Sequence, residues 1–292
     1  MNCKLRKTLF VLLVGVFLFA GSMLVFRLID AHRNTERQEL AESLADIPPE
    51  SVPAAQTPPT APTTSTTPTD PIPGETGTPT EEDPLDENVL RLQNWNLASL
   101  QTVNPDVIGW ILLPGTQINH PLLHTTDNST YLHTAWDGSY STSGSIFLET
   151  RSNPDFKDFN TIIYGHHMRN GSMFAPLMEY KNAEFLESHP YIYIATEDGI
   201  RKYTVFAAYE ASVTSDTYRL VFRNTAQKQT ALDSYLERSV WDSPITPTVS
   251  DRILTLSTCT GTGRYETRWV VQAILTGFWV NEKAGSPQRT SF

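Results

Sequence analysis

Cysteine is nearly absent from this chain of 292 residues, which contains only Cys3 and Cys259. Two cysteines exclude a disulfide-dense scaffold. Lys and Arg are missing between residues 38 and 90, where eleven acidic residues account for the formal net charge of −10. Without a basic stripe, no nucleic-acid partner is expected. No helix carries a His-X-X-X-His pair that could join a cysteine around zinc, so no zinc site is expected.

The N-terminus combines a positive cluster with a long apolar run. Lys4, Arg6 and Lys7 precede an uncharged run over residues 8–26. A helix of this length rises about 28 Å, enough to cross a hydrocarbon core. A cleaved signal peptide is the alternative, but the run is longer than the apolar part of a typical signal. We therefore expect a cytoplasmic N-terminus over residues 1–7 and a transmembrane signal-anchor over residues 8–27, with the rest outside the cell.

Residues 28–84 are expected to form an extracellular stalk. Eleven of the chain's 20 prolines fall between residues 48 and 84, interleaved with Thr, Ser and acidic residues. Such a segment cannot bury enough apolar surface to fold, and proline keeps it extended. O-glycosylation of the stalk is compatible with this composition. The remaining residues, 85–292, are numerous and apolar enough to fold around one core.

The pattern from residue 85 onward predicts a mainly β domain. Short β-rich runs separated by turn residues cover 107–112, 117–123, 145–149, 161–164, 191–196, 200–209, 252–257 and 268–280. Eight such strands predict a sandwich or a closed barrel. Apolar residues at helical spacing predict an N-terminal helix over about 89–100 and further helices near 173–178 and 225–240, the last with Asn224 as its N-cap.

Cys259 is the first candidate for chemistry. It ends the predicted strand that begins at residue 252, and the predicted topology puts it across the membrane from Cys3, so the two cannot pair. A thiol at a strand end is accessible, and a nearby guanidinium favours its thiolate and can stabilise an oxyanion. Arg264 and Arg268 both follow Cys259 within ten residues, so either could supply this guanidinium. A buried, inert thiol is the alternative.

A cysteine nucleophile also needs a partner for proton transfer. Six histidines lie beyond residue 84, but only His166 and His167 come directly after a strongly β run, residues 161–164, through Gly165. This places an imidazole at the mouth of a strand. The residues alone leave either histidine open as the partner.

Residues 255–259 read Thr-Leu-Ser-Thr-Cys, and residues 162–168 read Ile-Ile-Tyr-Gly-His-His-Met. The first segment resembles the Thr-Leu-X-Thr-Cys signature of sortases, and the second resembles the histidine segment of that family, most closely that of class B. Arg268 stands before Trp269 as the family's arginine stands before its last strands, and residues 127–132 add to the class B likeness. The resemblance covers about residues 86–280. It implies a closed eight-stranded sortase-type β-barrel with an N-terminal helix and a helical insertion before the cysteine strand.

The resemblance also implies site residues. Cys259 would be the nucleophile, His166 the general acid and base, and Arg268 the group that binds substrate and steadies the oxyanion. His167 matches a variable position, and Arg264 stands in a loop rather than at a strand start. The residues implied to line the substrate groove are Asn128, Leu132, Thr214, Tyr218 and Ser257. Thr260 stands where some class B members carry an acid, so no role for that acid is implied here.

The function implied is that of a cysteine transpeptidase. It would cleave an Asn-Pro-X-Thr-X-like sorting signal near the C-terminus of secreted surface proteins after Thr, and transfer the acyl group to an amine of a peptidoglycan precursor. Two alternatives come from other classes. One is a sortase that polymerises pilins onto a lysine acceptor, and the other is a non-catalytic stalked surface module with an inert Cys259.

Overall fold

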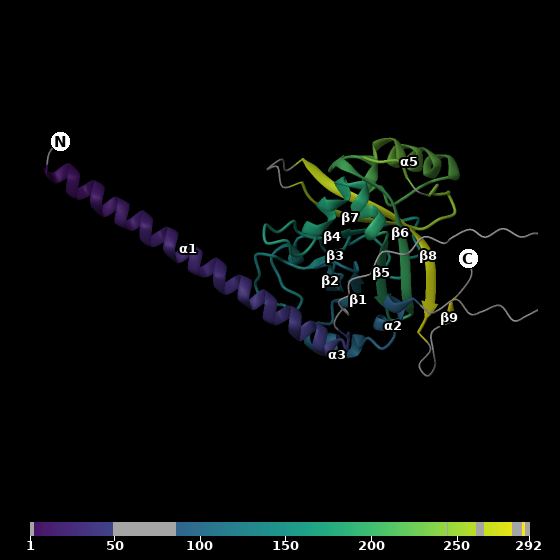
Figure 1. The fold of residues 1–292 in the computed structure, drawn as a ribbon, viewed down its shortest axis with the longest axis horizontal. Coiled ribbons are helices and arrows are strands. Elements are labelled where there is room, and N and C mark those ends of the chain that lie inside the picture. Colours follow the sequence, from purple (N-terminus) through teal and green to yellow (C-terminus); the bar gives the residue numbers. More distant parts are fainter. Residues whose placement is uncertain (1–2, 49–85, 244, 261–265, 282–287, 290–292) are drawn as a thin grey trace, which may run out of the picture.

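The computed structural model describes residues 3–48, 86–243, 245–260, 266–281 and 288–289. Its centre is a closed, mixed β-barrel (Figure 1). The eight barrel strands are β1 (Val107–Leu112), β2 (Asn119–Leu123), β3 (Ile146–Leu148), β4 (Asn160–Tyr164), β5 (Tyr191–Thr196), β6 (Gly199–Ser212), β7 (Ile253–Cys259) and β8 (Thr267–Val280). Their order is β6-β5-β1-β2-β3-β4-β7-β8, and pairing of β6 with β8 closes the barrel. The short strand β9 (Gln288–Arg289) is added to β8.

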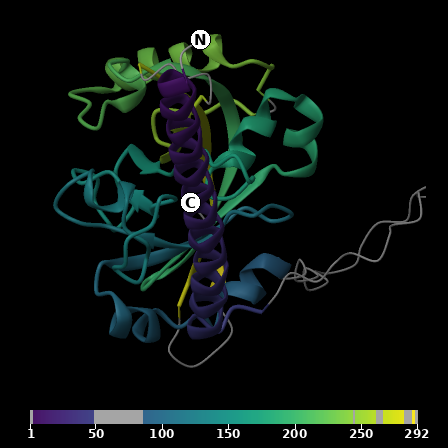
Figure 2. The ribbon, with the colours of Figure 1, turned by 90° about the vertical axis from the view of Figure 1, so that its left-hand side faces the viewer.

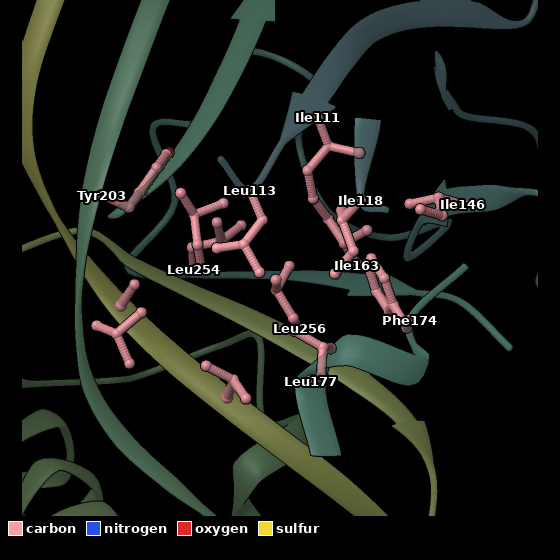
Figure 3. Packing of buried hydrophobic residues seen from close by; sticks show 14 of the residues in the cluster. Ile111, Leu113, Ile118, Ile146, Ile163, Phe174, Leu177, Tyr203, Leu254 and Leu256 are labelled. Carbon is pink, nitrogen blue, oxygen red and sulfur yellow. The ribbon is translucent and has the colours of Figure 1, made fainter. Parts of the chain in front are cut away.

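The barrel interior explains why these runs form strands. Alternate residues of β7, Leu254 and Leu256, point into the main core with Ile163 from β4 and Ile111 from β1 (Figure 3). The intervening residues of β7 point to the other face, as the two-residue period of a strand requires. Because both β4 and β7 carry such apolar positions, the core fixes the register of the strands whose ends carry His166 and Cys259.

Helices cover the outside of the barrel. The helix expected over 89–100 is two short helices, α2 (Glu87–Leu92) and α3 (Leu97–Val103), because the side chain of Asn96 caps a new helix start by accepting a bond from the Ser99 amide. The segment near 173–178 is a 3₁₀ helix, η2 (Ala175–Lys181), followed by α4 (Ala183–Ser188). Two further 3₁₀ turns are η1 (Thr130–Leu132) and η3 (Asp216–Tyr218).

The expected helical insertion before the cysteine strand is confirmed as α5 (Thr225–Arg238). Asn224 is its N-cap and accepts a hydrogen bond from the amide of Gln227. Leu232 and Tyr235 on its inner face are buried in a cluster with Phe206 of β6. This apolar face fastens the insertion to the barrel.

The N-terminal helix differs from the expected domain boundaries. Helix α1 (Cys3–Leu44) includes a stretch long and apolar enough to cross a membrane, with a mean hydropathy of 2.3. It does not stop at residue 27. Residues 28–44, which we expected to begin the stalk, continue the same helix, and their C-terminal end lies against the barrel (Figures 1 and 2). Residues 49–84 of the expected stalk lie outside the described residues.

The two described ends that flank residues 49–85 lie side by side. Arg91 of α2 donates from Nε to the carbonyl of Pro48 at 2.7 Å, and the amide of Asn96 donates to the carbonyl of Ala45 at 2.9 Å. The chain therefore leaves the barrel and returns to it at nearly the same place. Because the residues on either side of 49–85 are in contact, the length of that segment does not separate the barrel from α1.

Candidate active site

Cys259 is the last residue of β7, where the strand leaves the barrel. The six residues before it are buried, whereas Cys259 is exposed and its thiol is free. The alternative of a buried thiol is therefore wrong. Cys259 shares one face of the strand with Ser257 and Thr255, since side chains two apart point the same way.

Arg268 lies opposite Cys259. The antiparallel pairing of β7 and β8 makes Cys259 and Arg268 direct cross-strand partners. Side chains in such a pair have Cβ atoms about 5 Å apart. The Nη1 of Arg268 donates to the carbonyl of Thr267 at 3.0 Å. The structure thus places Arg268 beside Cys259 on the neighbouring strand, while the rival Arg264 lies outside the described residues.

His166 reaches the same end of the barrel from β4. That strand is parallel to β7, with Tyr164 opposite Ser257, and the amide of Gly165 donates to the carbonyl of Ser257 at 3.3 Å. His166 is two residues beyond Tyr164, as Cys259 is two residues beyond Ser257. Both side chains therefore leave from adjacent, parallel strand ends.

One ring nitrogen of His166 is held by the main chain. Its Nε2 donates to the carbonyl of Leu132 at 2.8 Å, and its ring stacks on His133 with centroids 6.1 Å apart. Since a carbonyl only accepts, Nε2 carries the hydrogen, and Nδ1 is the nitrogen left to exchange a proton. The neighbouring His167 differs because its Nδ1 is buried.

Glycine precedes these histidines for a steric reason. A Cβ on Gly165 would lie 2.7 Å from the ring of Phe174, a core residue. The main chain at Gly165 must therefore pass directly over this ring to bring His166 to the strand end. A larger residue would displace either the ring or the histidine segment.

Three of the five expected groove residues meet at this end of the barrel. The hydroxyls of Tyr218 and Ser257 are hydrogen-bonded at 2.9 Å, and the Leu132 carbonyl holds His166. Burial raises the pKa of Tyr218, while the Ser257 hydroxyl and the charge of Arg268 oppose the rise and the charge of Cys259 adds to it. The charges of Arg268 and Cys259 therefore both act on the Tyr218 hydroxyl.

The other two expected groove residues sit differently. Asn128 is held by both ends of its amide, donating to Glu149 at 2.8 Å and accepting from the Thr150 amide at 2.9 Å. Thr214 follows β6, and its hydroxyl bonds only to that of Ser212 at 3.0 Å among the contacts described. Neither side chain has a described contact with Cys259, His166 or Arg268.

Glu149 was not recognised in the sequence. It is buried, with its side chain 4% exposed, and its Oε2 accepts from Asn128 and from the hydroxyl of Tyr164 at 3.0 Å. Tyr164 in turn stacks on Tyr218, with centroids 6.5 Å apart. The carboxylate thus links the Asn128 segment to the aromatic pair beside Ser257. The only sequence signal for its role was the position of this acid directly after the apolar residues 146–148.

Other features of the molecule do not extend this site. Within the described part of the chain, no three His, Cys, Asp or Glu side chains gather in a group that could hold a metal ion. A cavity of about 470 Å³ lies between α1 and the barrel, and none of the expected catalytic or groove residues lines it. The cluster around Cys259 is therefore the candidate active site, with a free thiol, an imidazole and an arginine on adjacent strand ends.

Comparison with known proteins agrees with this geometry. Residues 111–276 match the family model of the sortase domain. The chain is 40% identical over 184 residues to sortase B of Listeria monocytogenes, which covers 61% of this chain and 73% of that protein. It is 37% identical over 161 residues to sortase B of Staphylococcus aureus, covering 55% and 66%.

Solved structures give the same result. A Staphylococcus aureus sortase B–substrate complex superposes with a TM-score of 0.58 at 36% identity, covering 61% of this chain and 83% of that one. Sortase B from Listeria monocytogenes superposes with a TM-score of 0.56 at 36% identity, covering 60% and 98%. Both neighbours are class B enzymes, and the expected barrel with its helical insertion is the fold they share.

Proposed function

This chain belongs to the sortase family as a cysteine transpeptidase of class B, and on that premise we propose that Cys259, His166 and Arg268 are its catalytic residues. The substrate is an extended sorting signal near the C-terminus of a secreted surface protein, of the Asn-Pro-X-Thr-X type. The observation that carries this proposal is the direct cross-strand pairing of Cys259 with Arg268.

In the first half-reaction, the Cys259 thiolate attacks the carbonyl carbon of the signal's threonine. A carbon–sulfur bond forms, and the carbonyl electrons move onto oxygen. Arg268, fixed opposite Cys259, donates hydrogen bonds to this oxyanion, a form of stabilisation whose loss typically costs 10²–10³-fold in rate. Collapse of the intermediate breaks the peptide bond, and the leaving amine takes a proton from His166. A thioester remains on Cys259.

In the second half-reaction, an amine of a peptidoglycan precursor attacks the thioester. His166 takes the proton that the amine loses, the carbon–sulfur bond breaks, and Cys259 leaves as thiolate. A new peptide bond then joins the surface protein to the acceptor. The hydrogen bond from Nε2 to Leu132 supports this role, because it orients the ring and leaves Nδ1 to give and take the proton.

Tyr218, Ser257 and Leu132 form the wall of the groove nearest the nucleophile. The hydrogen bond between Tyr218 and Ser257, the bond from His166 to the Leu132 carbonyl and the charge of Cys259 acting on Tyr218 support this placement. Asn128 and Thr214 lie further along the groove, where Asn128 is held by Glu149. The similar sortase B of Staphylococcus aureus has been solved as a complex with substrate, which supports a substrate-binding site in this fold.

The apolar part of α1 anchors the enzyme in the cell membrane. Lys4, Arg6 and Lys7 keep the N-terminus in the cytoplasm, since positive charge is retained on that side. The barrel is then outside the cell, where secreted surface proteins and peptidoglycan precursors are its partners. No cofactor takes part in either half-reaction.

A quenched pentapeptide library tests this function. The full chain in lipid nanodiscs is expected to cleave Asn-Pro-X-Thr-X peptides after Thr, and Cys259→Ala is expected to abolish cleavage. In the presence of an amine acceptor, mass analysis of the product identifies the transferred group. Cleavage that persists in Cys259→Ala, or that occurs at another bond, would contradict the proposal.

The nature of the acceptor distinguishes wall attachment from pilin polymerisation. Muropeptide-like amines and a lysine-bearing pilin peptide are offered in competition to the thioester formed on Cys259. Wall attachment predicts that the muropeptide-like amine dominates the products. Preferential transfer to the lysine would favour the polymerising alternative.

A further inference from the structure

A stripe of residues on the membrane-distal part of α1 docks on the barrel. The first member is Asp30, one residue beyond the exposed apolar Ile29. Its carboxylate accepts bonds from the amide and the hydroxyl of Thr142. One turn later, Asn34 accepts from the hydroxyl of Ser141 and donates to that of Ser143, each at 2.9 Å. Two successive turns of α1 thus bind the loop before β3.

The stripe continues on the next turns. Arg37 forms an ion pair with Asp137 at 3.4 Å, and its carbonyl accepts from the indole of Trp136 at 2.9 Å. Gln38 is bonded through Oε1 to the Nδ1 of His120 on β2 at 2.6 Å. Because residues three and four apart lie on one face of a helix, these contacts belong to the same stripe as Asp30 and Asn34.

The end of the stripe is buried in the core. Ala41 and Ala45 are fully buried, in a cluster that includes Leu92 of α2 and Trp110 of β1. Small side chains at these positions let the helix approach the barrel closely. Polar contacts over three turns and an apolar end give one specific orientation of α1 on the barrel.

This docking places the active site near the membrane end of the helix. Thr142, bonded to Asp30, lies two residues before Gly144, and a Cβ on Gly144 would be 2.7 Å from the carbonyl oxygen of Leu132. That same carbonyl accepts the hydrogen bond from His166. In Figure 1, β8 also begins on the side of the barrel from which the N-terminal half of α1 projects.

We propose that α1 is one continuous helix that leaves the bilayer and holds the barrel with its active-site end facing the lipid headgroups. Asp30 is only about 5 Å along the helix axis from Arg27, because each residue rises 1.5 Å. The enzyme therefore acts on groups presented at the membrane surface. The inference rests on the membrane anchor of the proposed function, and it replaces the extended stalk by a short, rigid connection.

Distance to the bilayer is measured with spin labels on the full chain in nanodiscs that contain nickel-chelating lipid. In a Cys3→Ser background, a methanethiosulfonate spin label is attached to Cys259. A second sample carries the label at Glu197→Cys with Cys259→Ser. Residue 197 lies at the other end of the barrel, since β6 pairs its first residue with the end of β8 and its last with the start of β8. We expect the headgroup nickel to remove most of the signal from the Cys259 label and little from the label at 197.

A matched pair of variants tests whether docking causes this orientation. Ala41→Arg puts a long charged side chain into the buried contact, whereas Ser43→Arg adds the same side chain at an exposed position of the same helix. We expect Ala41→Arg to remove the difference between the two labels and Ser43→Arg to retain it. If Ala41→Arg does not fold, the double variant Asp30→Ala, Asn34→Ala removes the polar contacts without placing a charged side chain in the core.

The outcomes separate this inference from the proposed function. Equal signal loss at both labels in the parent protein, or an unchanged difference in a folded docking variant, would overturn the orientation. Incorporation into nanodiscs reports on the anchor, and peptide cleavage reports on catalysis, so failure of either is seen independently. Free pentapeptides are expected to be cleaved at the same rate by Ser43→Arg and by the folded docking variant.

Discussion

Cys259 and Arg268 face each other across two antiparallel strands, at the last residue of β7 and the second residue of β8. Both strands contribute side chains to the barrel core, and their main-chain pairing fixes which residues lie opposite each other. If they act as we propose, the nucleophile and its oxyanion donor are held on neighbouring strands before substrate arrives. Such preorganisation lowers a barrier without reorganisation during the reaction.

Arg268→Lys tests whether the shape of the guanidinium matters in addition to its charge. Lysine keeps the positive charge but lacks the planar fork of donors. We expect kcat/KM for a quenched sorting-signal peptide to fall about 100-fold, as for loss of an oxyanion donor, with an unchanged melting temperature. Activity in Arg268→Lys close to that of the parent would limit Arg268 to a general electrostatic role.

Gly144→Ala tests the support of His166. Gly144 has a φ of 56°, and a Cβ there would meet the carbonyls of Tyr131 and Leu132 at 2.4 and 2.7 Å. Displacing the Leu132 carbonyl releases His166, so we expect kcat to fall at least about tenfold, a part of the roughly 10²–10⁴-fold that a positioned general acid supplies. Gly138→Ala is the control, with a φ of 82° but open space around it. It should cost only about 1–2 kcal/mol of backbone strain and retain activity.

Glu149→Gln tests the buried carboxylate behind the groove. Asn128 and Tyr164 both donate to its Oε2, and the amide and Nε of Arg151 donate to its Oε1, so an amide group in its place would set a donor against one of these two sets. A buried group left without its partner costs about 1–3 kcal/mol. We expect KM for the peptide to rise more than kcat falls, because Tyr164 supports Tyr218 rather than the reacting atoms. Arg151→Gln is the control, since the Arg151 side chain is 72% exposed and such pairs contribute little.

Tyr218 and Ser257 are suited to a double-mutant cycle. Their hydroxyls are 2.9 Å apart at the side of the nucleophile. For peptide binding, we expect Tyr218→Phe and Ser257→Ala to show a coupling energy of about 0.5–1.5 kcal/mol, the usual net value of a hydrogen bond. Strictly additive effects would mean that the bond has no part in shaping the groove.

His120 makes stability sensitive to acid. Burial lowers its pKa from 6.5 to about 4 in the folded state, against an opposing bond from Gln117. Its Nδ1 is bonded to Gln38, close to the carboxylate of Glu42 on the same helix, whereas its Nε2 is buried. Above pH 6.5 the ring is neutral in both states and the full stability is present.

As the pH falls from 6.5 toward 4, His120 binds a proton in the unfolded chain but stays neutral in the folded protein. This lowers the free energy of unfolding by about 1.4 kcal/mol per pH unit. Urea unfolding at several pH values is expected to show that slope in the parent, and a flatter curve in His120→Gln. Identical curves for both proteins would assign the acid sensitivity to other groups.

Much of the barrel could be predicted from local patterns. The runs 107–112 and 191–196 coincide with β1 and β5, because their alternating and continuous apolar residues are buried in the barrel. Strand β6 extends to Ser212, beyond the expected end at Tyr209, since β8 pairs with it to the last residue. Such an extension depends on a partner strand and leaves no local signal.

The site was predictable only in part. Cys259, His166 and Arg268 stand at strand ends that the sequence marks, and the structure brings those ends together. Glu149 was missed because its partners, Asn128 and Tyr164, are 21 and 15 residues away in the chain. The docking of α1 was missed for the same reason, as Asp30 and Thr142 are 112 residues apart. Composition predicted a stalk from residue 28, whereas such distant partners hold α1 on the barrel from Asp30 onward.

The hydrogen bond between Arg91 and the carbonyl of Pro48 has a consequence for how this chain can change over generations. A segment whose two ends meet at neighbouring points of the barrel can become longer or shorter without moving the barrel relative to α1. Doubling the length of such a connection costs only about 0.6 kcal/mol. We therefore expect insertions and deletions between residues 49 and 85 to be accepted freely, and the barrel to stay seated on its helix even if the connection is cut.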